Sequence, residues 1–252
     1  MARRSTIGGV AGKIRLDRAL SKLGLSSRSE ARELIAGGSV VVSGRVVTDP
    51  ARLVVLERTV IAIGGARAKR AEWRTIALHK TRGTITTRRD PEGRPTVFDL
   101  VSDEAHAMVA VGRLDRASTG LLLLTTDTQL AATLTDPANA FVRRYVVTAR
   151  GRVTDEDVMR IERGIDGLSA QAVQVLKRSN RETHLIVELT EGKNREIRRL
   201  LDATGHEVTR LLRVAFGGIE LGTLKPGEWR DVSKEEIERA FRLRAKRHAG
   251  QR

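Results

Sequence analysis

The pattern of hydrophobic and polar positions in the first quarter of the chain predicts two short helices followed by a β hairpin. Leu16, Leu20 and Leu23 lie four and three residues apart, so they form one face of a helix. The segment SSRSEARELIAGG begins with the capping-box spacing of Ser27 to Glu30 and ends on a glycine pair, which predicts a second helix. In SVVVSGRVVTDP, two β-branched runs flank a Ser43–Gly44 turn, as is typical of a hairpin.

Beyond residue 74, strand patterns outnumber helical ones, and the two kinds are intermingled. Strands are predicted at RTIALHK, GLLLLTTD, RRYVVTARG, QAVQVLKRS, THLIVELTEG and VTRLLRVAFGGIEL. Helices are predicted at TQLAATLT, at TDEDVMRIERGI after a Thr154 cap, at KNREIRRLLDATG, and from Ser233 onward. This irregular order favours an α+β body on a mixed or antiparallel sheet over a repeated βαβ unit.

With 252 residues, the chain is long enough for one large domain, or for a small domain and a medium one. GGARAKRAEW, Gly64 to Trp73, is basic and lacks an apolar period, so we interpret it as the linker between them. The predicted parts are a flexible N-terminus (1–12), a small head of helices and a hairpin (13–62), a linker (63–73), a body (74–240) and a basic tail (241–252).

The net charge of +15 is concentrated at the two ends of the chain. Residues 1–70 carry +9 and residues 241–252 carry +5, whereas the 170 residues between them are nearly neutral. Such ends suit a polyanion, and nucleic acid is the first candidate, although solubility alone is an alternative. Candidate RNA contacts in the head, which are otherwise a solvated helix face, are Arg15, Arg18, Lys22, Arg28, Arg32 and Arg45.

Several classes of function are disfavoured by what the sequence lacks. There is no cysteine, which excludes disulfides and thiolate catalysis and suits a cytoplasmic protein. The five histidines show no ligand spacing, and no nucleotide-binding glycine loop or G-x-S-x-G motif is present. No apolar run is long enough for a membrane helix, and the N-terminus lacks the apolar segment of a secretory signal. We therefore expect no metal, no cofactor and no membrane association.

The stretch GRLDRASTGLLLLTTD places Asp115 just before a strongly apolar run. A carboxylate in such a position is costly unless it is paired or used in chemistry. From the residues alone, Asp115 is either an ion-pair partner of Arg113 or Arg116, or a catalytic acid.

Two further stretches combine polar groups with strand edges or glycine turns. RRYVV contains Tyr145, the single tyrosine of the chain, which is otherwise an ordinary residue of an amphipathic strand. In EGKNREIRRL we expect a helix that opens near Lys193, with Arg195 and Arg198 on one face. A solvated helix face is the alternative for these basic residues.

The head resembles the S-four family of RNA-binding domains, named for a ribosomal protein, from about Ile14 to Val60. The body resembles the pseudouridine synthases, and within them the ribosomal RNA enzymes of the RsuA/RluB type. The blocks that carry this second resemblance are LHKTRGTITTRRDPEGRPTVFDLV, VGRLDRASTGLLLLTTD, RRYVV and EGKNREIRRLLDATGHEVTRLLRVAFGGIELGTLKPGEW.

The resemblance implies a role for each site residue. Asp115 would act covalently on the target uridine, Tyr145 would pack on the flipped base, and Arg198 would pair with the aspartate and keep it charged. Further contacts with RNA are expected from Lys80, Arg82, Lys193 and Arg195. The chain departs from the family pattern at Thr81, Arg144 and Glu196.

The function implied is the isomerisation of uridine in ribosomal RNA to pseudouridine by a monomeric enzyme. This reaction involves no net oxidation or reduction, in agreement with the absence of cofactor motifs. One alternative is an RNA-binding or ribosome-assembly factor that kept the fold and lost the reaction. A methyltransferase is a weaker alternative, because the chain lacks a cofactor-binding glycine loop.

Overall fold

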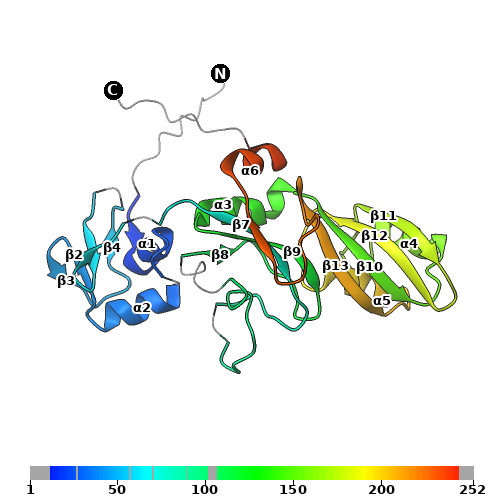
Figure 1. Cartoon of the computed structure of the whole chain (residues 1–252), viewed down its shortest axis with the longest axis horizontal. Helices are drawn as coiled ribbons and strands as arrows, with labels where there is room; N and C mark the ends of the chain where they lie inside the picture. Colours follow the sequence, from blue (N-terminus) through cyan, green and yellow to red (C-terminus); the bar gives the residue numbers. More distant parts are fainter. Residues whose placement is uncertain are drawn as a thin grey trace, which may run out of the picture. The chain divides into compact units, whose positions relative to one another are not determined.

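A computed structural model describes residues 12–26, 28–56, 58–69, 71–88, 90–101 and 107–243. The chain forms two compact units (Figure 1). The first, the head, comprises residues up to Glu72 with the short segments 106–108 and 126–128, and the second, the body, comprises the rest from Trp73. The predicted Ser27 cap, residues 1–11 of the N-terminus and the tail from residue 244 lie outside the described residues.

The head contains the two predicted helices and the predicted hairpin, which is part of a four-stranded sheet, and a further two-stranded sheet that the pattern did not predict. The helices are α1 (Leu16–Lys22) and α2 (Arg28–Ala36). The larger sheet has the order β3-β2-β5-β6, and β1 pairs with β4. The strands are β1 (Ile14–Arg15), β2 (Val40–Val42), β3 (Arg45–Val46), β4 (Leu53–Val54), β5 (Ile61–Ile63) and β6 (Ala66–Arg67).

The helical periodicity and the hairpin turn of the head are confirmed. Leu16, Leu20 and Ile35 are fully buried in its core. The turn between β2 and β3 has positive φ at Ser43 and Gly44, 49° and 82°, the conformation of a tight two-residue hairpin loop.

The predicted start of the linker is wrong. Ala66 and Arg67 form β6 and pair with Ile63 and Ala62 of β5 across a Gly64–Gly65 turn. Both glycines have positive φ, 56° and 84°, so they close a second hairpin rather than opening a flexible connection.

The body is built on a nine-stranded sheet of order β11-β12-β10-β13-β9-β7-β15, with β14 on β13 and β8 on β9 (Figure 1). Its named strand pairs are antiparallel except β13 and β9, which are parallel. The predicted α+β class with a mixed sheet is therefore confirmed. The strands are β7 (Thr75–Lys80), β8 (Val109–Ala110), β9 (Thr119–Thr125), β10 (Arg143–Arg150), β11 (Ala172–Arg178), β12 (Glu182–Leu189), β13 (Val208–Phe216), β14 (Ile219–Glu220) and β15 (Trp229–Asp231).

The body helices are α3 (Thr128–Thr135), α4 (Asp155–Arg163), α5 (Glu196–Asp202) and α6 (Lys234–Ala240), with a short 3₁₀ turn at Pro137–Asn139. The predicted caps are confirmed: Thr154 and Asp157 form a capping box on α4, and the Ser233 hydroxyl accepts a hydrogen bond from the Glu236 amide. No helix within the described residues is long and apolar enough to span a membrane.

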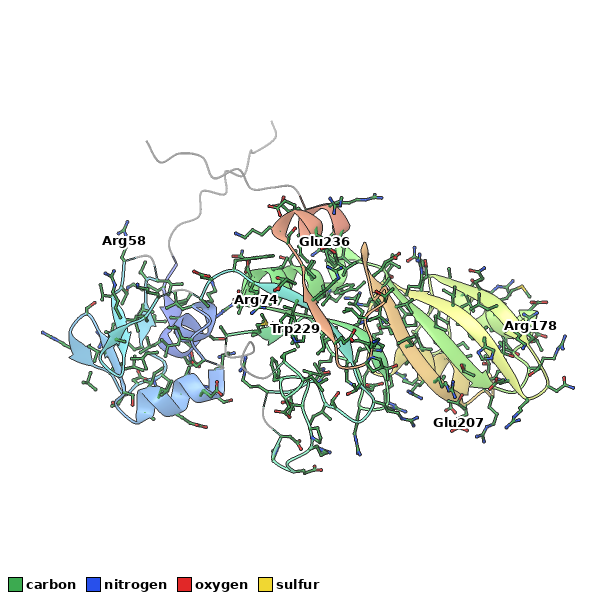
Figure 2. All side chains as sticks on the ribbon, in the orientation of Figure 1. Arg58, Arg74, Arg178, Glu207, Trp229 and Glu236 are labelled. Atoms are coloured by element: carbon green, nitrogen blue, oxygen red, sulfur yellow. The ribbon has the colours of Figure 1, made fainter. Side chains whose placement is uncertain are left out.

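The last helix is fixed to the sheet from both of its ends. Arg230 of β15 pairs with Glu236 of α6. Arg74 stacks on Trp229 of β15 (Figure 2) and pairs with Asp231 of the same strand. After α6, Phe241 is buried and packs edge-to-face on two other phenylalanines, at centroid distances of 5.0 and 5.1 Å. The body therefore includes Phe241, and the predicted boundary of the basic tail at residue 240 is wrong because this aromatic side chain belongs to the core.

The parallel crossing of β9 and β13 holds the end of the apolar strand in place. Leu121 to Leu124 are fully buried in β9. Gly120, with φ of 108°, lies so close to β13 that an added Cβ would stand 2.2 Å from the carbonyl oxygen of Arg213. Only glycine fits this crossing, and the loop that contains Asp115 leads directly into it.

Candidate active site

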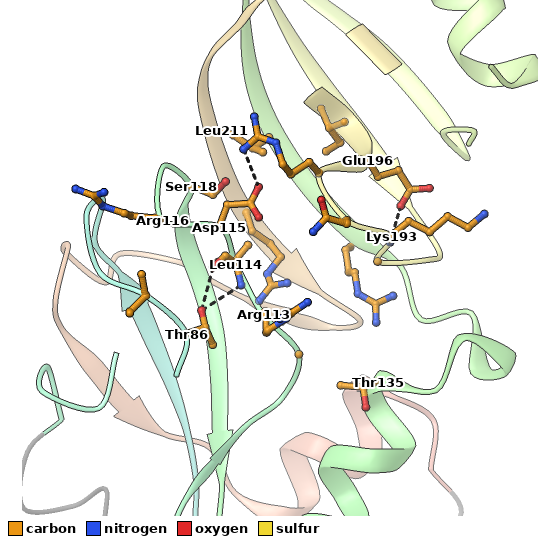
Figure 3. Close-up of a pocket in the computed structure, with 18 of the residues that line it drawn as sticks. Thr86, Arg113, Leu114, Asp115, Arg116, Ser118, Thr135, Lys193, Glu196 and Leu211 are labelled. Carbon is orange, nitrogen blue, oxygen red and sulfur yellow. Dashed lines mark hydrogen bonds and ion pairs between the residues drawn. The ribbon is translucent and has the colours of Figure 1, made fainter. Parts of the chain in front are cut away.

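The body contains a cavity of about 760 Å³. Figure 3 shows how the side chains of several separate segments converge on it. Its lining comes from residues 85–94, from the loop 111–118, from residues 189–197, and from the inward faces of β10 and β13. Asp115, Tyr145, Lys193 and Arg195, which the sequence singled out, all line this one cavity.

The backbone of the Asp115 loop is held by hydrogen bonds with the Thr86 side chain and within the loop itself. The Leu114 amide donates to the Thr86 hydroxyl (3.3 Å), which in turn donates to the Leu114 carbonyl (3.0 Å; Figure 3). The Asp115 carbonyl accepts the Ser118 amide at 3.0 Å and closes a turn. With its neighbour Leu114 buried, Asp115 exposes 33% of its side chain to the cavity, so a fixed carboxylate remains accessible.

The cation nearest to Asp115 is Arg195, whose Nη1 lies 3.9 Å from Oδ2. The predicted ion pair with Arg198 is not formed: among the described residues Asp115 pairs with Arg195, and the Arg198 Nη1 donates to the carbonyl of Val208 at 2.7 Å. Burial lowers the pKa of Arg198, and the nearby charge of Asp115 partly offsets this. Arg198 thus contributes to the electrostatic field at Asp115 without forming an ion pair with it.

Arg195 does not share a helical face with Arg198, contrary to the prediction. It stands just before α5, in a left-handed conformation with φ of 50°, and the helix begins at Glu196. This turn, which the helical pattern gave no reason to expect, brings the Arg195 side chain to Asp115. Among the described residues, Asp115 forms no ion pair with its sequence neighbours Arg113 and Arg116.

Tyr145 lies on the wall of the cavity, near the start of β10. Arg143, Tyr145 and Val147 alternate along the strand and are all buried, as expected for one face of a sheet. The strand register places Tyr145 opposite Val187 of β12 and Arg213 of β13. The position predicted for Tyr145 in the site is therefore correct, and its contact with a base stays a prediction.

Lys80 is completely buried, so its predicted direct contact with RNA is wrong. Its ammonium donates to the carbonyls of Thr81 (3.0 Å) and Ser118 (2.9 Å). Burial lowers its pKa to about 8, although Asp115 acts in the opposite direction. Lys80 therefore holds the end of the Asp115 loop through its hydrogen bond to the Ser118 carbonyl. Arg82, in contrast, is exposed.

The segment before α5 is held by a buried carboxyl group. Glu196 accepts the backbone amide of Lys193 at 3.1 Å (Figure 3), and burial raises the pKa of Glu196. The exposed ammonium of Lys193 pairs with Glu191 at 2.7 Å and donates to the Gly167 carbonyl at 2.9 Å. Lys193 is thus accessible at the cavity but is already bonded within the protein.

Sequence reasoning missed two buried arginines that line the cavity, Arg143 and Arg213. Both are buried, and both guanidinium groups lie over the ring of Phe216, at 4.6 and 5.7 Å from its centroid. The signal was available in the sequence: each arginine occupies an inward position of an alternating strand pattern, where an apolar residue is the norm.

In the head, all six basic residues predicted to contact RNA are exposed. Three of them surround the fully buried carboxylate of Asp17: Arg32 at 3.0 Å, Arg15 at 3.3 Å and Arg28 at 3.5 Å. Burial acts to raise the pKa of Asp17, but the hydrogen bonds from Arg32 and Arg15 outweigh it and lower this pKa. Asp17 therefore fixes the directions of three exposed guanidinium groups.

Residues 74–203 match the family described as RNA pseudouridylate synthase. The chain belongs to this family. Residues 14–60 match the S4 domain, so this RNA pseudouridine synthase carries the RNA-binding head that the resemblance implied. Within the described residues, no group of three or more histidine, aspartate or glutamate side chains could hold a metal ion.

Three proteins and one crystal structure illustrate the likeness of this synthase to known ones. An "Uncharacterized RNA pseudouridine synthase" of Aquifex aeolicus is 33% identical over 91% of this chain and 94% of that protein. Proteins named "Ribosomal large subunit pseudouridine synthase B" are 34% identical in Bacillus subtilis (89% of this chain, 94% of that protein) and 38% in Yersinia pestis (86% and 72%). A "Crystal structure of pseudouridylate synthase" superposes with a TM-score of 0.63 at 25% identity, over 90% of this chain and 99% of that one.

Proposed function

We propose that this synthase converts uridine to pseudouridine in ribosomal RNA of the large subunit, and that Asp115 is the group that acts on the ribose. The observation that carries the proposal is an accessible carboxylate on a fixed loop of the cavity, 3.9 Å from a guanidinium. The RNA class is taken from the relatives in Bacillus subtilis and Yersinia pestis, whose names specify the large ribosomal subunit.

The reaction transfers C1′ of the ribose from N1 to C5 of the same uracil. A carboxylate can assist by dividing this difficult step into two easier ones, provided that it stays ionised in a partly closed pocket. A cation within about 4–6 Å favours the ionised form. Arg195 meets that condition directly, and Arg198 adds to the positive field.

The uridine has to leave the RNA stack to reach Asp115. Flipping a nucleotide costs a few kcal/mol, which an enzyme recovers by receiving the base in a fitted pocket. Tyr145 offers an aromatic surface on the wall of the cavity, and exposed Arg195 stands beside Asp115 where phosphates of the entering strand would pass.

The head supplies the remaining contacts with folded RNA. Its exposed basic residues neutralise phosphates, so binding through them releases counterions and weakens as salt rises. Three of these arginines are oriented by contacts with the same buried carboxylate, that of Asp17.

Mapping pseudouridines in ribosomal RNA tests the proposal and separates it from a binding factor that lacks the reaction. Transcribed large-subunit and small-subunit RNA are incubated separately with the full chain, and pseudouridines are located at nucleotide resolution. We expect at least one new pseudouridine in the large-subunit RNA and none in the small-subunit RNA. Binding without any new pseudouridine contradicts the proposal, and modification confined to the small-subunit RNA contradicts its substrate.

A further inference from the structure

The guanidinium of Arg213 uses only part of its hydrogen-bonding capacity. Its Nε donates to the carbonyl of Leu121 at 2.6 Å. Its Nη2 is buried and has no hydrogen-bond partner among the described residues, while the whole residue is only 3% exposed. An unpaired buried donor is unfavourable, and a charged one more so, so its retention in the wall of the cavity points to a ligand.

The strand register fixes where this donor lies. Arg213 stands opposite Tyr145 of β10 on one side and opposite Gly120 of β9 on the other. Because Gly120 has no side chain, β9 approaches closely enough for Arg213 to reach the Leu121 carbonyl across it. The guanidinium is therefore held in place by β9, and Arg213 lines the cavity beside its cross-strand neighbour Tyr145.

The surroundings of Arg213 favour a ligand that carries negative charge. Lys80 and Arg143 are also buried, and the charge of Arg213 contributes to lowering the pKa of each. A group of buried cations is stabilised when an anion or a strong acceptor arrives.

The depth of the site distinguishes the base from the phosphate. The phosphates belong to a strand that must enter and leave, so they remain near the mouth, whereas the flipped base goes deepest. If Tyr145 takes the face of the base, its cross-strand neighbour Arg213 meets the edge. The acceptors on that edge are the carbonyl oxygens O2 and O4.

The reaction places negative charge on these same atoms. When the N1–C1′ bond breaks, its electron pair stays with uracil and is delocalised from N1 over O2 and O4. C1′ meanwhile bonds to the Asp115 carboxylate, or the ribose gives up a neighbouring proton to that carboxylate. C5 then bonds to C1′ as the bond between C1′ and the Asp115 carboxylate breaks, or as the carboxylate returns its proton to the ribose, and the C5 proton leaves to solvent.

We infer that Nη2 of Arg213 donates to a carbonyl oxygen of the flipped uracil and stabilises the uracil anion after the glycosidic bond breaks. A half-turn of the ring about its N3–C6 axis exchanges N1 with C5 and O2 with O4. A donor fixed in the wall therefore meets a carbonyl oxygen before and after the turn. The inference rests on the proposed isomerisation of uridine.

The test combines Arg213→Met and Arg213→Lys with RNA substrates whose target uridine is replaced by 2-thiouridine or 4-thiouridine. Arg210→Gln, at an exposed position of the same strand, is the control. We expect Arg213→Met to lower kcat by about 10²-fold, as for the loss of one donor to an anionic intermediate, with KM little changed. Arg213→Lys should recover part of the loss. Sulfur is a weaker acceptor, so each thio substrate should slow the wild type at least about five-fold more than it slows Arg213→Met.

Each other outcome has a definite meaning. If the wild type turns over uridine, but a thio substrate slows the wild type no more than it slows Arg213→Met, the inference is wrong. If Arg213→Met instead weakens binding of all RNAs and reduces the salt dependence by about one phosphate contact, Arg213 binds the backbone and the inference is also wrong. If Arg213→Met does not fold, the slowing of the wild type by the thio substrates is compared with the slowing of Arg213→Lys. Equal slowing of the two proteins then overturns the inference. If the wild type itself forms no pseudouridine, the proposed function fails, whatever the variants do.

Discussion

Arg195 reaches Asp115 from a backbone conformation that few non-glycine residues adopt. Its φ is 50°, and its Nη1 lies 3.9 Å from the Asp115 Oδ2. Both side chains are partly exposed, so the pair adds little to stability. A strained residue that gains little stability is best explained by its position beside the carboxylate that we propose acts on the ribose.

Replacing Arg195 by Gln should therefore reduce catalysis more than stability. We expect kcat to fall about ten-fold, because the carboxylate loses the cation that orients it, while the melting temperature changes little. Arg199→Gln, which removes the same charge from an exposed position of α5, is the matched control. Equal losses in the two variants would show that general attraction of RNA, rather than the contact with Asp115, is responsible.

Replacing Gly120 by Ala should disrupt the crossing of β9 and β13. The new Cβ would stand 2.2 Å from the Arg213 carbonyl, and the φ of 108° is unfavourable for alanine. We expect a loss of at least about 3 kcal/mol in the free energy of unfolding, measured by chemical denaturation. Gly83→Ala has a similar φ of 95° with open space around it, so it should lose only about 1–2 kcal/mol. Equal losses at the two positions would contradict the close approach of the strands.

The buried Lys80 predicts how stability changes with pH. Its pKa is about 8 in the folded chain and 10.5 in the unfolded one, so between these values the unfolded chain binds more protons. Stability therefore rises with pH across this window, and the penalty of burying the charge is present in full below pH 8. Relative to that of Lys80→Met, the free energy of unfolding of the wild type, measured by denaturant titration, should rise by about 1–3 kcal/mol between pH 7 and pH 10. A difference that does not vary with pH would mean that Lys80 is not desolvated.

Asp17 should stabilise the head through its arginines. Asp17→Asn leaves three guanidinium groups without their shared carboxylate, and we expect a loss of about 1–3 kcal/mol, measured by hydrogen exchange of α1 and α2. Because the folded pKa of Asp17 is lowered, its contribution is present above about pH 4 and is lost as the pH falls further. The difference in stability between the wild type and Asp17→Asn should therefore become smaller as the pH falls below about 4. The exposed Asp49→Asn should show no comparable change, and a loss as large there would contradict the special role of Asp17.

The regular parts of the fold were predictable because their signals are local. The leucine spacing of α1, the Ser43–Gly44 turn and the caps at Thr154 and Ser233 each depend on a few adjacent residues. Strand β6, with two residues, carries no such signal, and its glycine turn is indistinguishable from a linker in the sequence.

The site was predictable in part. Asp115 and Tyr145 were found because a charge before an apolar strand and a single tyrosine are conspicuous, and because both match family blocks. The burial of Lys80 and the contact between Arg195 and Asp115 were not, because each depends on the packing of segments that are far apart in the chain. Arg213 could have been suspected from its inward position in β13, although the pattern gives no sign of its unpaired donor.

The central claim is that Asp115 is the group that acts on the target uridine. The most direct test measures release of tritium from C5 of uridine in large-subunit RNA by the wild type and by Asp115→Asn, with Asp202→Asn, exposed at the end of α5, as the control. We predict that Asp115→Asn is folded, still binds the RNA, and releases tritium at least about 10³-fold more slowly, while the control matches the wild type. Release by Asp115→Asn within ten-fold of the wild-type rate would contradict the account.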